Sequence, residues 1–517
     1  MNNYNEINNI VNEYTIDDQN SPSISKLTNG GFVLAYHSKM QNGNGYDIVI
    51  QIYDVFGNKF LTKVIDDIQD LEKDQKHPTV SEIAKNKFVV AWVSDNTNIH
   101  SQIFLSTGEK VGEKIIIKQN ANLCYESDIA PLSSDSILDS AFIISWTAWA
   151  GVERHGRYCS LFAGMYNSLG EIIFEENLVS DNNDNTRWHP YVNSNSTHLC
   201  IVYNADDGIR GQLCNSQVHA VTYDVLGGKS SNVTIQDEIS QISPTLPCYG
   251  RFSSTSVYTS NSIVYLWENQ DGNGNWQIFL KNYVDNIPVT NAIQVTSSLN
   301  GYHNVNPKAI TVSNDKIFLA YHQFSLNSLE DCIFVEVIDS IGIRVTEPIK
   351  VNAGNAVNRA FSLTDYDLLS IDKLSNRDII LGWTCLDSSG YGVCIQRFDS
   401  NGNLINLILP TPQPTEIPSS TPTKVPTHIP SEQPTDNYVQ LTYAPTGATI
   451  IAIPCFNLKE NITCTREWIQ FEGSGRLDLA CKCDDGSIAI YANRGDKLEY
   501  IGFLGEGNYP NNCTSGE

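Results

Sequence analysis

One short apolar stretch occurs seven times along this chain, and it restricts the fold more than any other feature. The copies are FVLAYHS at 32, FVVAWVS at 88, FIISWTA at 142, LCIVYNA at 199, IVYLWEN at 263, IFLAYHQ at 317 and IILGWTC at 379. Their fifth residues are Tyr36, Trp92, Trp146, Tyr203, Trp267, Tyr321 and Trp383. These aromatic residues are 56, 54, 57, 64, 54 and 62 residues apart. A period of this size indicates a repeat architecture.

Each unit reads as four short strands with turn signals between them. The first strand is exemplified by 21–27 and 77–83, the apolar stretch is the second, and an alternating third strand such as 47–54 follows. Third strands end in turns that carry Gly57, Gly108, Gly170, Gly227, Asn286, Gly342 or Gly402. Glycine and asparagine tolerate the positive φ of such turns. The pattern predicts an all-β fold with a seven-bladed β-propeller over residues 1–409.

The ends of the repeat array predict how the ring closes. Only seven residues lie between Gly402 and Pro410, so the last unit lacks most of its outer strand. About 20 residues precede the first unit, and they contain INNIVNEYTI (7–16). We expect this segment to pair with blade seven, because closure removes the open sheet edge.

The first and last units resemble a known family. LTNGGFVLAY (27–36) with QIYDVFGNK (51–59), and GYGVCIQRFDSNGN (390–403), are similar to the tandem propeller-forming repeats of bacterial haemolysin-type surface proteins. The resemblance covers residues 1–409. It implies an extracellular or surface-exposed propeller and implies no reaction.

Two further segments follow the repeats. Residues 410–436 carry proline at every fourth position, which predicts an extended linker rich in Pro, Thr and Ser. Residues 437–517 predict a small Cys-rich β domain, and 464–509 resemble one repeat of the cyanovirin-N homology lectins. That resemblance implies a Cys464–Cys481 disulfide and oligosaccharide binding. The family domain uses two repeats, whereas only one is visible here.

Composition narrows the partners and the location. A net charge of −25 disfavours binding to nucleic acid. The sequence contains no run of 18 apolar residues, so no membrane insertion is expected. The N-terminus does not read as a secretory signal, yet 13 cysteines favour an extracellular or surface location. Cys385 and Cys394 lie on adjacent strands of unit seven and are a predicted disulfide. Glycosylation sequons begin at Asn195, Asn232, Asn461 and Asn512.

The connections between second and third strands predict a ligand-binding face. They are longer than the glycine turns, as in TAWAGVERHGR (147–157) and NADDGIRGQLCNSQ (204–217). Sites commonly lie on loops that a rigid scaffold holds. The candidate ligand-binding residues on this face are Trp149, Trp188, Asp206, Asp207, Arg210 and Tyr302. Ordinary surface loops are the alternative interpretation.

Besides ligand binding, the sequence raises two further hypotheses: a calcium site and catalytic carboxylates in the central channel. Asp271, Asn273 and Asn275 alternate as the ligands of a calcium loop do, although a hairpin turn explains them equally. No other cofactor is expected. Glu82, Asp128 and Asp372 lie on first strands and are candidates to point into the central channel, where propeller glycosidases place their carboxylates.

These observations favour a non-catalytic glycan-binding or adhesion protein at a cell or particle surface. Its partners would be glycans or surface proteins. The alternatives are a structural subunit of an extracellular filament or coat, which would self-associate, and a propeller glycoside hydrolase or lyase.

Overall fold

The computed structural model places two compact units, residues 1–414 and 415–517. In the first unit it describes residues 10–39, 45–65, 74–118, 124–132, 141–153, 156–179, 186–195, 198–206, 216–224, 229–236, 253–297, 301–325, 331–351, 369–387 and 390–405. In the second unit it describes four strands between residues 464 and 504. The linker 410–436 lies outside the described residues. Within the described ranges the structure contains no helix long and apolar enough to cross a membrane.

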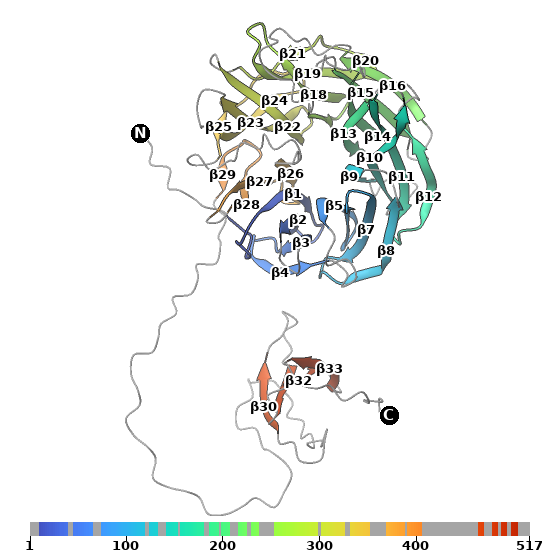
Figure 1. Ribbon diagram of the computed structural model, residues 1–517. Helices are drawn as coiled ribbons and strands as arrows, with labels where there is room; N and C mark the ends of the chain where they lie inside the picture. Colours follow the sequence, from blue (N-terminus) through green and yellow to red (C-terminus); the bar gives the residue numbers. More distant parts are fainter. Residues whose placement is uncertain are drawn as a thin grey trace, which may run out of the picture. The chain divides into compact units, whose positions relative to one another are not determined.

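The first unit is a seven-bladed β-propeller, as the repeats predict (Figure 1). Blade one contains β1 (Gln19–Lys26), β2 (Phe32–Lys39), β3 (Tyr46–Tyr53) and β4 (Lys59–Val64). Blade two contains β5 (Gln75–Ala84), β6 (Lys87–Ser94), β7 (Asn98–Leu105) and β8 (Lys110–Lys118). Blade three contains β9 (Cys124–Pro131), β10 (Ala141–Glu153), β11 (Gly156–Asn167) and β12 (Ile172–Leu178). Blade four contains β13 (Thr186–Ser194), β14 (His198–Asp206), β15 (Ser216–Asp224) and β16 (Lys229–Gln236).

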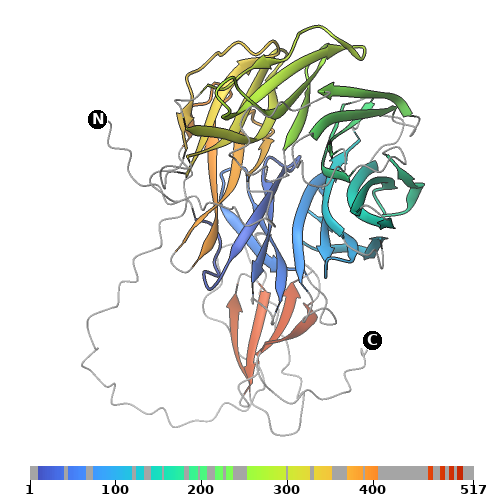
Figure 2. The same cartoon turned by 45° about the horizontal axis from the view of Figure 1, so that its top comes forward.

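The remaining three blades follow the same antiparallel order. Blade five contains β17 (Ser254–Tyr258), β18 (Ile263–Gln270), β19 (Trp276–Val284), β20 (Ile287–Pro288) and β21 (Ile293–Gln294). Blade six contains β22 (Tyr302–Ser313), β23 (Lys316–Ser325), β24 (Asp331–Asp339) and β25 (Ile349–Lys350). Blade seven contains β26 (Leu369–Lys373), β27 (Ile379–Leu386), β28 (Tyr391–Phe398) and β29 (Leu404–Ile405). The first strands β1, β5, β9, β13, β17, β22 and β26 each contact the next around a central channel (Figures 1 and 2).

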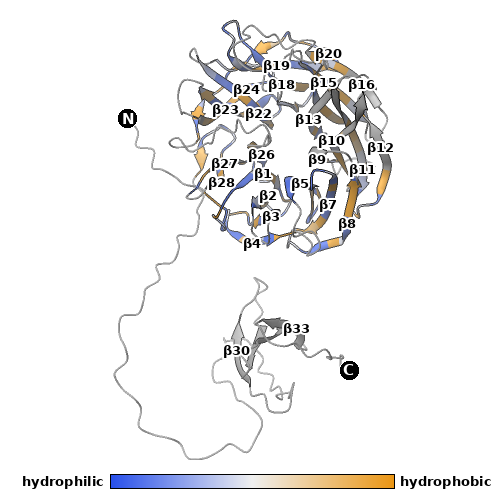
Figure 3. Cartoon of the chain, viewed as in Figure 1, coloured by the Kyte–Doolittle hydropathy of each residue, from blue (hydrophilic) through white to orange (hydrophobic). Residues whose placement is uncertain are grey.

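The repeated apolar stretch is the second strand of each blade, and both of its faces are buried. In β6, Val90 and Trp92 pack in a cluster with blade one, whereas Val89 and Ala91 pack in a cluster with Trp146 of blade three. Alternate side chains of one strand thus join the sheets on its two sides. Apolar residues colour these strands orange in Figure 3. The large fifth residue fills the space between neighbouring sheets.

The turns after the third strands adopt the backbone that their sequence predicts. Gly57, Gly108, Gly170, Gly342 and Gly402 have φ between 79° and 86°, and Asn286 has a φ of 64° in blade five. Asp54, Asn167, Asp339 and Asp399 begin four of these turns and accept backbone N–H bonds from the residues two and four positions later. Gly227 lies outside the described residues.

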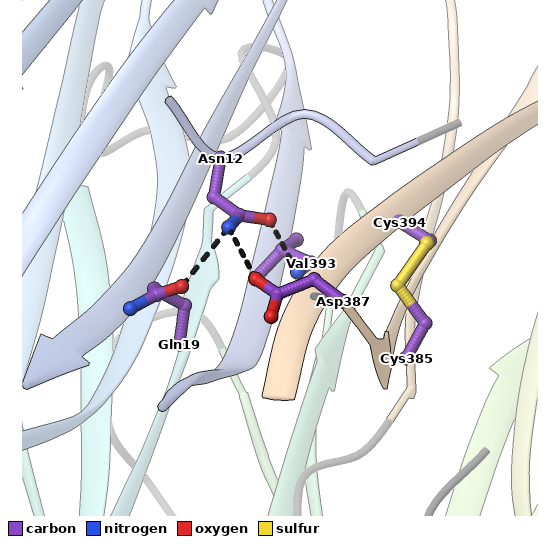
Figure 4. The surroundings of a disulfide bond; sticks show 6 residues. All are labelled: Asn12, Gln19, Cys385, Asp387, Val393 and Cys394. Carbon is purple, nitrogen blue, oxygen red and sulfur yellow. Dashed lines mark hydrogen bonds between the residues drawn. A yellow bond between two sulfur atoms is a disulfide. The ribbon is translucent and has the colours of Figure 1, made fainter. Parts of the chain in front are cut away.

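The N-terminal segment closes the ring, as predicted. Ile10 forms a β-bridge with Cys394, and Val11 N–H donates to the Val393 carbonyl at 2.9 Å. Asn12 Oδ1 accepts Val393 N–H at 2.9 Å, while its Nδ2 donates to Asp387 Oδ2 at 3.2 Å (Figure 4). The predicted strand 7–16 does not extend past Asn12, because residues 13–16 leave the sheet; residues 7–9 lie outside the described residues. The edge of β28 is therefore covered partly by residues 10–12 and partly by β29.

Cys385 and Cys394 form the disulfide that the sequence suggested. It joins the second and third strands of blade seven (Figure 4), and Cys394 is also the bridge partner of Ile10. Register places Cys394 opposite Trp383 and Cys385 opposite Gly392, so the two cysteines pair diagonally. Among the cysteines that the structure describes, Cys200 and Cys332 are free thiols, and both are buried.

The second unit is described only as a backbone sheet. It consists of β30 (Cys464–Ile469), β31 (Asp478–Cys483), β32 (Ile488–Asn493) and β33 (Leu498–Leu504) in antiparallel order. Register aligns Cys464 with Cys483, and Cys481 with Arg466. The cysteine side chains lie outside the described atoms, so the Cys464–Cys481 disulfide stays a prediction. Among the sequons, Asn195 lies beside a β13–β14 turn and Asn232 lies in β16, whereas Asn461 and Asn512 lie outside the described residues.

Candidate functional site

The predicted ligand-binding loops are shorter in the structure than in the sequence analysis. β10 continues through Trp149 to Glu153 and β11 begins at Gly156, so the expected loop 147–157 is mostly a hairpin of two strands. Trp188 lies in β13 and Asp206 ends β14. The side chains of Trp149, Trp188 and Asp206 are not described. Asp207 and Arg210 lie outside the described residues.

Tyr302 is the one candidate of this set whose side chain is described. It begins β22, is half-buried, and pairs with Ser325 of β23. Its carbonyl accepts a hydrogen bond from Gln277 Nε2 at 3.4 Å. The six candidates therefore come from blades three, four and six, and the loop site stays a prediction.

The candidate calcium residues form the turn between β18 and β19. Asp271 Oδ1 accepts the N–H groups of Asn273 and Asn275 at 2.8 and 2.9 Å, and Asn275 Nδ2 lies 3.4 Å from Asp271 Oδ2. The Asp271 carboxylate thus stabilises its own hairpin, as Asp54 and Asp399 do in the turns after third strands. Within the described residues no group of three or more His, Cys, Asp or Glu is arranged for a metal ion.

A cavity of about 640 Å³ occupies the central channel. It is lined by the first strands of all seven blades, by second-strand residues of blades five and six, and by Trp276 of β19. Its lining contains Glu82, Asp128 and Asp372, which confirms that these three carboxylates reach the channel. The volume lies within the range of about 300–1,000 Å³ that small-molecule sites occupy.

Each of these carboxylates holds a backbone amide of an adjacent blade. Asp128 Oδ2 accepts Val192 N–H at 2.7 Å. Asp372 Oδ2 accepts Lys26 N–H at 2.8 Å, and Glu82 Oε1 accepts Thr28 N–H at 2.6 Å. Burial raises the pKa of Glu82 and of Asp372, and these hydrogen bonds act against the rise.

Serine hydroxyls make the same kind of contact around the channel. Ser23 Oγ accepts Val80 N–H at 3.0 Å, and Ser370 Oγ accepts Ile24 N–H at 2.8 Å. The inner edge of each first strand faces no further strand, so its amide groups need side-chain acceptors. The channel carboxylates therefore join neighbouring blades, which explains their position without catalysis.

A second set of contacts lies where the first strands begin. Ser21, His77, His189 and Asn306 each precede a proline and have φ between 50° and 55°. Such a backbone is unfavourable for residues other than glycine. Each of these residues donates its N–H to an acceptor in the preceding blade. Ser21 N–H donates to Thr384 Oγ1 at 3.3 Å, and His77 N–H donates to His37 Nδ1 at 3.3 Å. His189 N–H donates to Glu126 Oε2 at 3.2 Å, and Asn306 N–H donates to Glu268 Oε1 at 2.7 Å.

Two signals in the sequence mark this second set, and the recurrence of His77 and His189 before proline indicates a structural role. An X-Pro pair recurs at the start of four first strands. Three of the four acceptors, Thr384, His37 and Glu268, directly follow the aromatic residue of the repeated stretch. The fourth, Glu126, lies on β9 and also contacts His189 Nδ1 at 2.8 Å.

Glu268 differs from the other acceptors because it is a buried acid in the cavity wall. Glu268 is 5% exposed, and burial raises the pKa of its carboxyl group to about 8. Hydrogen bonds from the N–H groups of Asn306 and Ser253 to Oε1 only partly oppose this rise. The Glu268 carboxyl is therefore neutral at pH 7.

Aromatic and imidazole groups complete the cavity wall. Phe324 and Trp276 line the blade five and six side, together with His322, whose pKa burial lowers to about 4. Tyr191 lines the blade four side, with Lys308 Nζ 5.4 Å from its ring centroid. The arrangement offers aromatic surface, hydroxyl groups and uncharged polar groups to a ligand.

The sequence matches no family model and no curated protein. Among solved structures, it is similar to an α-L-arabinanase from Penicillium chrysogenum complexed with arabinobiose, at 12% identity and a TM-score of 0.39, over 64% of this chain and 94% of that one. The β-propeller domain of the Trilobed protease from Pyrococcus furiosus is 9% identical with a TM-score of 0.43, over 76% and 98% of the two chains. A puromycin hydrolase is 9% identical with a TM-score of 0.47, over 89% of this chain and 58% of that one. At this level none of these likenesses bears on function.

Proposed function

We propose that this protein is a non-catalytic glycan-binding protein that takes its ligand in the central channel of the propeller. The observation that carries the proposal is the lining of the 640 Å³ cavity, which combines Tyr191, Trp276 and Phe324 with hydroxyl, amide and charged side chains. Aromatic faces and planar polar groups are the usual means by which proteins hold sugar rings. The channel replaces the loop face as the preferred site, because its side chains converge from all seven blades.

The engagement of the channel carboxylates supports a binding function. Glu82, Asp128 and Asp372 each accept a backbone N–H bond of 2.6–2.8 Å from a neighbouring blade. A glycosidase needs one carboxyl group to donate a proton and another to act as base or nucleophile. Carboxylates that hold the ring together are poorly suited to change protonation during a reaction.

We propose that the protein acts at a cell or particle surface, with the C-terminal unit as a second contact. The proline-rich linker 410–436 would tether the two units. Two weak sites on one tether bind a shared surface more strongly than either site alone.

A glycan array tests the proposal with the full-length chain. The wild-type protein should bind a defined subset of glycans, and Tyr191→Ala should lose that signal. Phe56→Ala provides a matched control, because Phe56 is 70% exposed on a turn outside the cavity. Binding that is equal in all three proteins would contradict a channel site, and the absence of any glycan signal would contradict the function.

A glycoside hydrolase is the second candidate, and Glu268 is the observation that favours it. A neutral carboxyl group in a cavity wall has the protonation state that a general acid requires. Release of reducing sugar from a polysaccharide panel by the wild-type chain, abolished in Glu268→Gln, would establish this alternative.

A further inference from the structure

Three buried polar side chains meet the cavity at the junction of blades five and six. Glu268 lies on β18, Asn306 lies in the bulge of β22, and His322 lies on β23 opposite Val305. Glu268 Oε1 accepts Asn306 N–H at 2.7 Å, which joins the two blades at this point. All three side chains line the cavity, and the exposed fractions of the residues are 5%, 8% and 6%.

Each of these side chains keeps a polar atom that the described protein does not satisfy. His322 Nε2 and Asn306 Oδ1 have no hydrogen-bond partner among the described residues. Glu268 Oε1 takes two backbone N–H bonds, whereas no described residue bonds to Oε2. Buried polar groups in folded proteins are nearly always hydrogen-bonded, so the two unsatisfied buried atoms of His322 and Asn306, beside the Oε2 of Glu268, indicate a ligand-binding place.

The chemistry of the three atoms defines what they accept. Because Oε1 of Glu268 is an acceptor of two N–H groups, the proton of the neutral carboxyl lies on Oε2, which is therefore a donor. Asn306 Oδ1 is an acceptor, and His322 Nε2 is a donor or an acceptor according to its tautomer. Donors and acceptors of this kind match hydroxyl groups, each of which both donates and accepts.

The three subsite side chains offer no charge to a ligand at their own position. Glu268 and His322 are both neutral at pH 7 because burial disfavours their charged forms. Phe324 and Trp276 add apolar surface to the same part of the wall. A charged group brought here would lose its hydration without gaining a counter-ion from these residues.

We propose that Glu268, Asn306 and His322 form a subsite for one uncharged sugar ring, which they hold through adjacent hydroxyl groups. The subsite rests on the proposed glycan-binding function and specifies which sugars that function selects. Neutral hexoses fit it, whereas the matching uronic acids do not.

Isothermal titration calorimetry with the full-length chain tests the subsite at pH 6.5. The probes are glucose, galactose and mannose, each compared with its uronic acid. The wild-type chain should bind at least one neutral hexose and should bind the matching uronic acid at least ten-fold more weakly. His322→Leu replaces the imidazole by an apolar side chain of similar size, and it should weaken binding of that hexose about ten-fold or more. His198→Leu is the matched control, because His198 is an exposed histidine at the start of β14, outside the cavity, and it should bind as the wild type does.

The outcomes separate the subsite from the general function. If His322→Leu binds the hexose as the wild type does while Tyr191→Ala loses binding, the channel binds sugar and the subsite is wrong. Tighter binding of the uronic acid than of the hexose also overturns the subsite. If no sugar or array glycan binds the wild type, the glycan-binding function itself is refuted. Thermal melting of both variants shows that each is folded before binding is compared.

Discussion

Replacing Glu268 by glutamine should remove a loss of stability that the wild-type protein undergoes as the pH rises. The pKa of this carboxyl is about 8 in the folded protein, against an ordinary value of 4.5. Between these values the folded state keeps the proton and the unfolded state releases it, so stability falls with increasing pH. Below pH 4.5 both states are protonated, and above pH 8 both are ionised.

The structure sets the size of this effect. A separation of roughly 3.5 pH units, at about 1.4 kcal/mol per unit, corresponds to roughly 4–5 kcal/mol of unfolding free energy. Glutamine accepts the N–H groups of Asn306 and Ser253 through its Oε1 and carries no titrating proton. The Glu268→Gln chain should therefore resemble the wild type near pH 5 and exceed it by several kcal/mol near pH 9.

Urea unfolding at pH 5, 6, 7, 8 and 9 measures the difference between the two proteins. Other groups titrate over this range, but they are common to both chains and cancel in the comparison. Curves that stay parallel from pH 5 to pH 9 would refute a neutral Glu268 in the folded state. Asp399→Asn is a control, because hydrogen bonds from Asn403 and Asn401 lower the pKa of the Asp399 carboxyl and it is ionised throughout this range.

Three further predictions concern the ring. Asn12→Ala removes the hydrogen bonds that fix the N-terminal segment to blade seven and to Gln19 of blade one, and it should cost about 2–4 kcal/mol, seen as a lower melting temperature. An unchanged melting temperature would contradict closure by this segment. Replacing Cys385 and Cys394 together by alanine should cost about 2–3 kcal/mol, and a reductant should lower the melting temperature of the wild type only. Equal sensitivity of both proteins to the reductant would contradict the disulfide. Asp128→Asn should keep stability within about 1 kcal/mol because its amide oxygen still accepts Val192 N–H, whereas Asp128→Ala should lose about 1–3 kcal/mol in urea unfolding. Equal losses in both variants would contradict the amide-holding role.

Features that repeat along the chain could be predicted from the sequence. The seven apolar stretches identify the second strands, because a strand buried on both faces must be apolar at every position. The glycine turns and Asn286 mark the ends of the third strands through their need for positive φ. The short last unit and the extra N-terminal residues predict ring closure, since an exposed sheet edge needs a partner.

Features that depend on contacts between blades could not be predicted. Glu82, Asp128 and Asp372 were recognised as channel residues, but their bonds to backbone amides require the spacing between first strands. The raised pKa of Glu268 depends on burial by side chains from other units. The 147–157 segment was expected to be a loop because its polar and glycine residues resemble turn residues, yet pairing with β11 keeps it in a strand.

A crystal structure of the full-length chain soaked with the glycan that gives the strongest array signal tests the channel site most directly. We expect sugar density inside the propeller, with one uncharged sugar ring in contact with His322, Asn306 and Glu268. Density confined to the outer hairpins or to the C-terminal unit, with the channel free of sugar, would contradict it.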